Sequence, residues 1–120
     1  MTKAEVHKPG IVDKLVGDKV PDMIKAEGNV PITHIATGSE YTIRLRRKLS
    51  EEVDALLRVK TPDQLDEKIG DVLEVLRSYA QLGGRDMKTI EAKRQAKYTT
   101  HGGFSRGIVL ERVEEESRKK

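Results

Sequence analysis

The fold is decided by SEYTIRLRRKLSEEVDALLRV at residues 39–59, a stretch that contains neither glycine nor proline. Its apolar side chains recur at helical spacing, which predicts a long amphipathic helix. Thr37 and Glu40 stand at the spacing of a capping box, so we expect the helix to begin between them. The predicted core stripe consists of Ile43, Leu45, Leu49, Val53, Leu56 and Leu57.

A second helix is predicted over residues 62–82, PDQLDEKIGDVLEVLRSYAQL. Thr61 is its expected N-cap, Pro62 suits the first helical position, and Gln64 completes the capping pattern. Because so few residues separate the two helices, we expect them to be antiparallel neighbours. The buried stripe of this helix is predicted to be Leu65, Ile69, Val72, Leu73, Leu76 and Ala80.

Shorter elements are predicted on both sides of this pair. Residues 21–26 should form a short helix and residues 30–36 an extended segment. A third helix should begin after Asp86 as its N-cap and end near Tyr98, before a loop over residues 99–104. Its inward-facing residues are expected to be Met87, Ile90 and Ala96.

These elements predict an all-α fold. We expect a flexible N-terminal arm at residues 1–13, one helical domain at residues 14–112 and a C-terminal tail at 113–120, where residues 114–120 resemble a fraying helical end. A chain this short cannot cover every apolar stripe by itself. We therefore expect a bundle of antiparallel helices that is completed by oligomerisation, as a homodimer or a larger assembly.

The composition excludes several classes of protein. The 120 residues contain no cysteine, so disulfide scaffolds, thiol nucleophiles and cysteine metal sites are excluded. The net charge of +3 is spread along the chain and only four side chains are aromatic, which does not favour nucleic-acid binding. We see no signal peptide or membrane span, so we expect a cytoplasmic protein without a membrane partner. The histidines, expected at the surface, are His7, His34 and His101.

Carboxylates gather beside the predicted core stripes. Glu52 takes a place on the first helix where an apolar residue would be expected, directly after Glu51. On the second helix, Glu67, Asp71 and Glu74 follow at spacings of four and three, which puts their carboxylates on one face. Acids beside an apolar surface are costly unless they are paired, and helical bundles often hold a metal between facing helices. Oxygen ligands of this kind suit Mg²⁺.

The alternative is that these acids form ion pairs with neighbouring cations on solvated helix faces. The candidate cations are Arg44, Lys48, Lys68 and Arg77. Spacing alone leaves both interpretations open.

Four segments carry a resemblance to a known family. They are KLVGDKVP at residues 14–21, KLSEEV at 48–53, IGDVLEV at 69–75, and Lys97 followed by GGF at 102–104 and GI at 107–108. In this order and spacing they resemble the phosphoribosyl-ATP pyrophosphohydrolase-like branch of the MazG-type nucleotide pyrophosphohydrolases. The resemblance implies an all-α, usually dimeric protein that uses Mg²⁺ to split a nucleoside triphosphate into a monophosphate and diphosphate.

The resemblance also implies metal ligands, of which only half are present. A Glu-x-x-Glu pair falls on Glu52 and Ala55, and a Glu-x-x-Asp pair falls on Lys68 and Asp71. In addition, Gly17 stands where the family motif has an arginine. Lys68 brings a cation to a position where the family has an anionic ligand, and a cation repels Mg²⁺.

Two functions therefore stay open from the sequence. One is a Mg²⁺-dependent nucleoside triphosphate pyrophosphohydrolase of house-cleaning type with a partly degenerate metal site. The other is a non-catalytic relative that serves as a nucleotide-binding or interaction module. For the hydrolase, the expected catalytic acids are Glu51, Glu52 and Asp71, the metal ligands come from these three with Glu67 and Glu74, and the nucleotide contacts are Lys97 and Arg94.

Overall fold

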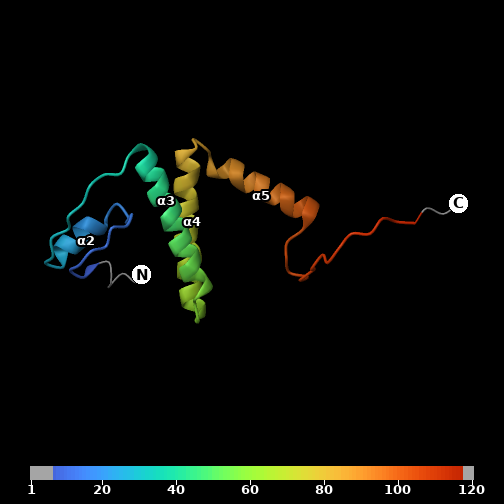
Figure 1. Cartoon of the computed structure of the whole chain (residues 1–120), viewed down its shortest axis with the longest axis horizontal. Helices are drawn as coiled ribbons and strands as arrows, with labels where there is room; N and C mark the ends of the chain where they lie inside the picture. Colours follow the sequence, from blue (N-terminus) through green and yellow to red (C-terminus); the bar gives the residue numbers. More distant parts are fainter. Residues whose placement is uncertain (1–6, 118–120) are drawn as a thin grey trace. The chain divides into compact units, whose positions relative to one another are not determined.

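The computed structural model describes residues 7–117, in which the regular elements are helices and no strand is present. They are α2 (Val20–Ala26), α3 (Gly38–Leu57), α4 (Pro62–Leu82) and α5 (Met87–His101), drawn in Figure 1. The predicted all-α class is confirmed. The chain divides after Arg85 into two units, and each is described by itself below. Parts of the expected N-terminal arm (1–6) and C-terminal tail (118–120) lie outside the described residues.

Helices α3 and α4 lie side by side and run in opposite directions, as expected (Figure 1). The capping signal between them is formed: the Thr61 hydroxyl accepts a hydrogen bond from the Gln64 amide at 3.2 Å. The Gln64 side chain in turn accepts one from the Lys60 amide at 3.2 Å. Pro62 takes the first helical position, where its missing amide hydrogen leaves no hydrogen bond unmade. The predicted start of α4 is confirmed.

The start of α3 differs in detail from the predicted capping box. Thr37 is the N-cap residue, but its side chain makes no capping hydrogen bond with the described residues. Glu40 instead binds the His34 ring at 2.8 Å and lies 3.5 Å from Arg44 Nε. Gly38 has φ of +55°, a left-handed conformation that glycine adopts without strain. Glu40 therefore binds His34 and Arg44 in place of capping the helix.

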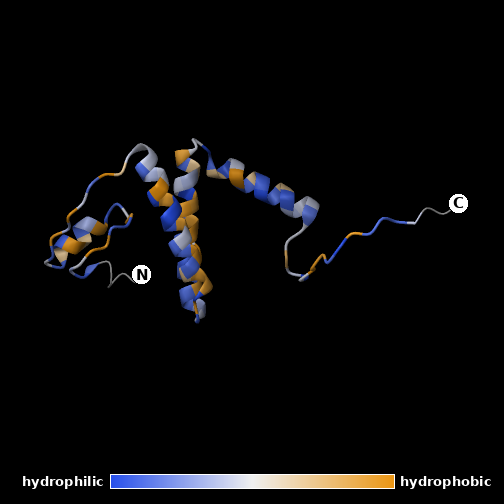
Figure 2. Ribbon diagram, viewed as in Figure 1, coloured by the Kyte–Doolittle hydropathy of each residue, from blue (hydrophilic) through white to orange (hydrophobic). Residues whose placement is uncertain are grey.

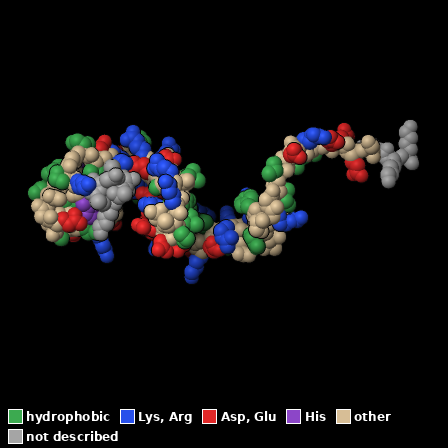
Figure 3. Space-filling model, turned by 90° about the horizontal axis from the view of Figure 1, so that it is seen from below, with side chains coloured by type: hydrophobic (Ala, Val, Ile, Leu, Met, Phe, Trp, Pro, Cys, Tyr) green, Lys and Arg blue, Asp and Glu red, His purple; other side chains and the backbone are tan. Residues whose placement is uncertain are grey.

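The hairpin has a small core. Among residues 7–117, the buried apolar residues are Leu45, Val75 and Ala80, and Leu45 is the most enclosed, at 2% exposed. Four apolar residues of α4 that were predicted to be buried are 41–54% exposed, because two helices can cover only one face of each other. Figure 2 shows the apolar residues along both helices, and Figure 3 shows apolar side chains reaching the surface. The four are Leu65, Ile69, Leu73 and Leu76, and we call them the α4 stripe.

The short helix α2 confirms the prediction for residues 21–26. Before it, His7 is 8% exposed, which corrects its expected place at the surface. Its ring lies 2.8 Å from the Glu27 carboxylate, and its backbone oxygen accepts a hydrogen bond from the Asn29 side chain at 3.1 Å. These polar partners just after α2 satisfy the enclosed histidine.

The second unit contains α5, which begins as predicted: the Asp86 carboxylate accepts a hydrogen bond from the Lys88 amide at 2.9 Å. The helix continues to His101, so the expected loop at 99–104 begins only at Gly102, whose φ is +83°. None of the α5 side chains, all of them described, is buried. The inward-facing role predicted for Met87, Ile90 and Ala96 is therefore wrong within this unit.

The described part of the C-terminal tail, residues 113–117, is not helical, which corrects the predicted helical end. Three consecutive glutamates at 114–116 repel one another, and there is no apolar stripe that could hold a helix there. None of the described helices is long and apolar enough to cross a membrane.

Candidate functional site

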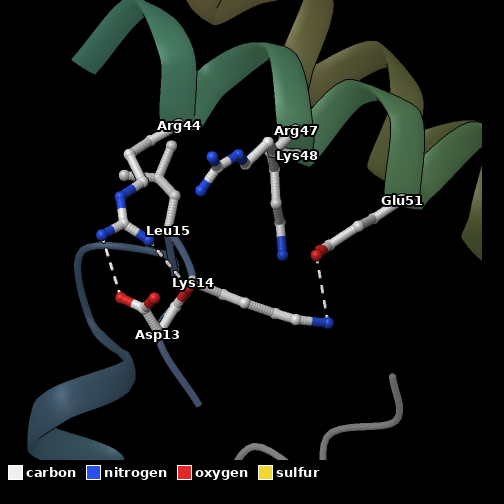
Figure 4. A pocket seen from close by; sticks show the side chains of 7 residues that line it. All are labelled: Asp13, Lys14, Leu15, Arg44, Arg47, Lys48 and Glu51. Carbon is white, nitrogen blue, oxygen red and sulfur yellow. Dashed lines mark hydrogen bonds and ion pairs between the residues drawn. The ribbon is translucent and has the colours of Figure 1, made fainter. Parts of the chain in front are cut away.

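The two predicted site acids of α3 are both held by lysines. Glu52 is the more enclosed, with 16% of its side chain exposed, as expected from its place beside the core stripe. Lys48 Nζ lies 3.4 Å from its carboxylate, one helical turn away. Glu51 binds Lys14 Nζ at 3.0 Å, and this lysine comes from the segment before α2 (Figure 4). Each acid thus has a cation partner of its own.

The three predicted site acids of α4 divide into one paired and two open residues. Lys68 Nζ donates a hydrogen bond to Asp71 at 3.3 Å. Glu67 and Glu74 are exposed, and their carboxylates form no ion pair with any described residue. Where residues 7–117 are concerned, no group of three or more His, Asp or Glu residues is arranged to hold a metal ion.

The donor set does not fit the Mg²⁺ site that the resemblance implies. Glu51, Glu52 and Asp71 each have an ammonium group within 3.4 Å. Ala55 has no oxygen ligand to offer, and Lys68 places a positive charge next to Asp71. An ammonium at that distance satisfies the carboxylate and repels a second cation. Sequence spacing had left ion pairs with Lys48 and Lys68 open as the alternative, and both are formed.

The two predicted nucleotide contacts, Arg94 and Lys97, lie in the second unit, on exposed faces of α5. The guanidinium of Arg94 donates to the Glu91 carboxylate, with the shortest distance 2.6 Å from Nη2 to Oε1. This hydrogen bond lowers the pKa of Glu91 and raises the pKa of Arg94. Arg94 is therefore engaged within its own helix, while Lys97 is exposed to solvent.

A pocket that the sequence analysis missed lies between residues 13–15 and α3 (Figure 4). Its lining is mainly charged, and four of its residues lie in two of the segments that carry the family resemblance, 14–21 and 48–53. The signal in the sequence was the row of cations on α3, with Arg44 followed three and four residues later by Arg47 and Lys48. The lining residues are Asp13, Lys14, Leu15, Arg44, Arg47, Lys48 and Glu51, and we call this the basic pocket.

Arg44 holds one side of the basic pocket together. Its guanidinium binds the Asp13 carboxylate at 2.9 Å and the Asp13 backbone oxygen at 2.8 Å. The hydrogen bond to Arg44 lowers the pKa of Asp13, and the same bond raises the pKa of Arg44. Asp13 has φ of +50°, a left-handed conformation that aspartate tolerates better than most residues. These contacts attach the segment before α2 to α3.

Comparison with known proteins gives one relative. A protein of Mycolicibacterium smegmatis (strain ATCC 700084 / mc(2)155), described as uncharacterised, is 38% identical over 50 residues. The match covers 42% of this chain and 51% of the relative, so the chain spans about half the length of the curated relative it matches. No family model matches the chain, and no solved structure matches it.

Proposed function

We propose that this chain is a non-catalytic relative of the MazG-type nucleotide pyrophosphohydrolases, which associates through its α3 and α4 helices and binds nucleotides without hydrolysing them. The observation that carries the proposal is the Lys68–Asp71 ion pair of 3.3 Å, formed where the resemblance expects two anionic ligands. To bind Mg²⁺ there, the Asp71 carboxylate would have to give up its contact with the Lys68 ammonium. That ammonium would still lie close to the bound metal. Coulombic repulsion at that distance weakens metal binding.

Self-association is supported by the apolar surface of the hairpin. The α4 stripe runs along one side of the helix at spacings of four, four and three, and each member is more than two-fifths exposed. Exposed apolar residues in a continuous row are typical of an interface. A second copy of this chain would present the same row, which is the self-complementary arrangement of a two-fold homodimer.

A second candidate is the Mg²⁺-dependent hydrolase. It is favoured by Glu67 and Glu74, whose exposed carboxylates form no ion pair among the described residues. Glu67 lies four residues before Asp71, so a shifted metal site could use these two acids in place of the missing ligands.

The experiment that separates the two is diphosphate release from a panel of nucleoside triphosphates, with and without Mg²⁺, together with calorimetric titration of ATP. For the unchanged protein we expect ATP binding and no release above buffer. Mg²⁺-dependent release would contradict the non-catalytic proposal and establish the second candidate. Absence of binding to every nucleotide would contradict both.

A double variant tests whether the missing ligands are the reason. Ala55→Glu with Lys68→Glu restores both carboxylates and removes the competing ammonium, so Mg²⁺ affinity should rise and diphosphate release should appear. Lys93→Glu with Ala96→Glu is the matched control, because it makes the same two changes on the exposed helix α5. If the first variant folds as the parent does but gains neither property, the resemblance extends to the fold alone.

A further inference from the structure

The basic pocket contains more positive charge than its carboxylates neutralise. Four of its lining residues are cations and two are acids. The cations belong to both walls: Lys14 comes from the segment before α2, and Arg44, Arg47 and Lys48 come from one face of α3. Cations this close together repel one another unless an anion lies between them.

The cations differ in how fully they are engaged. Arg44 is bound to Asp13 and Glu40, and Lys14 is bound to Glu51, so these two hold the walls together. Arg47 forms no ion pair with any residue in the described range 7–117.

Lys48, the neighbour of Arg47, has one ion pair, in which its Nζ lies 3.4 Å from the Glu52 carboxylate. Figure 4 shows the side chains of Arg47 and Lys48 extending from α3 toward residues 13–15. These two are the groups available to a ligand.

We infer that the basic pocket binds a phosphoryl group through Arg47 and Lys48, with Lys14 at its edge. The guanidinium offers paired donors that match two phosphoryl oxygens, and the ammonium adds a second charge. A phosphoryl dianion balances the excess charge of the pocket better than a carboxylate, which carries a single charge. Leu15 is the one apolar lining residue in the described part of the chain, so the site recognises phosphate and not a base. The inference rests on the proposed nucleotide binding and names the residues that would contact the phosphates.

The test uses the full-length, ¹⁵N-labelled chain titrated with inorganic phosphate, diphosphate and ATP in low salt, observed by NMR. Backbone amides of residues 13–15 and 44–51 should shift, and the larger anions should bind more tightly. Arg47→Gln should weaken diphosphate binding about tenfold, as expected for loss of one charge-assisted contact. The matched control is Arg46→Gln, which removes the same charge from the neighbouring position of α3 outside the pocket lining. Its effect should stay below about twofold, as for an exposed charge screened by solvent.

Two results would overturn the inference. One is the absence of shifts at residues 13–15 and 44–51 at millimolar diphosphate. The other is an equal loss of affinity in Arg46→Gln and Arg47→Gln, which would indicate attraction to the helix as a whole. If ATP binds but Arg47→Gln leaves its affinity unchanged, the pocket assignment fails and the proposed nucleotide binding stands. If phosphate and diphosphate bind at the pocket but no nucleotide binds, the pocket stands and the proposed function fails.

Discussion

The hairpin of α3 and α4 and the helix α5 are held by different forces. The hairpin buries Leu45, Val75 and Ala80 and connects to the preceding segment through Arg44. Helix α5 buries no side chain and depends on its cap at Asp86, on good helix-forming residues and on the Glu91–Arg94 pair. A helix of 15 residues supported only in this way is marginal in water. We therefore expect α5 to be much less stable than the α3–α4 hairpin, although both are regular helices.

The largest expected effect comes from shortening a buried side chain of the hairpin, compared with an exposed apolar side chain of α5. Leu45→Ala should lower the free energy of unfolding by about 2–5 kcal/mol, because it opens a cavity at the most buried position. Ile90→Ala, at an exposed apolar position of α5, should change it by less than about 0.5 kcal/mol. Urea unfolding followed by circular dichroism measures both. Comparable losses in the two variants would show that α5 is packed in solution as firmly as the hairpin.

The next effect tests whether the α4 stripe is an interface. Leu73→Lys places a charge in the middle of the stripe and should weaken self-association at least tenfold, about 1.4 kcal/mol, while the helices remain folded. Light scattering across a concentration series gives the mass, and circular dichroism gives the helix content. Gln81→Lys is the control, since it adds the same charge to an exposed position of α4 outside the stripe. A parent protein that is monomeric at micromolar concentration would contradict the assembly.

Local signals in the sequence predict the helices well and the tertiary contacts poorly. Thr61 and Asp86 act as caps, and the predicted helix ends are correct to within three residues. The ion pairs of Lys48 and Lys68 could also be anticipated, because a side chain one turn away is always within reach. Thr99, Thr100 and His101 still continue α5, which the local signals did not predict, and the hydroxyls of Thr99 and Thr100 bond to carbonyls one turn earlier.

What the sequence could not predict depends on residues far apart in the chain. Arg44 binds Asp13 across 31 positions, and no periodicity relates the two, so the basic pocket was missed. The burial of His7 depends in the same way on Glu27 and Asn29. The sequence predicted that one chain cannot cover all of its apolar stripes, but it did not identify the α4 stripe as the exposed one. An apolar helical pattern predicts that a face will be covered but not by which molecule.

A smaller effect compares the caps of the two regions. Asp86→Ala should cost about 1 kcal/mol of helix stability, as for other N-caps, and the loss should be confined to α5. Thr61→Ala should cost a similar amount, but across the whole hairpin, because α4 is packed against α3. Amide exchange should therefore accelerate about fivefold in α5 alone for the first variant and in both α3 and α4 for the second. Asp86→Asn is the control, since asparagine also caps well. Faster exchange throughout the hairpin in Asp86→Ala would mean that the two regions are coupled.

The smallest effect is a response to acid that should differ between the regions. The hydrogen bond from Arg44 holds the pKa of Asp13 below its ordinary value, and the hydrogen bond from Arg94 does the same for Glu91. A carboxyl whose folded pKa is depressed adds stability above its unfolded pKa and loses it as the pH falls through the folded value, so both contributions should be intact at neutral pH and disappear below about pH 4.

Both acids are exposed, so the change in overall stability should be small. The change should differ in location: protonation of Asp13 should loosen residues 13–15 from α3, where the Lys14–Glu51 pair remains, whereas protonation of Glu91 should affect α5 alone. In an NMR pH titration, the amides of residues 13–15 and 44 should move together in the parent and lose that acid transition in Asp13→Asn, with the transition at Glu91 unchanged. If residues 13–15 keep their acid transition in Asp13→Asn, the Arg44 contact is not what attaches this segment to the helix.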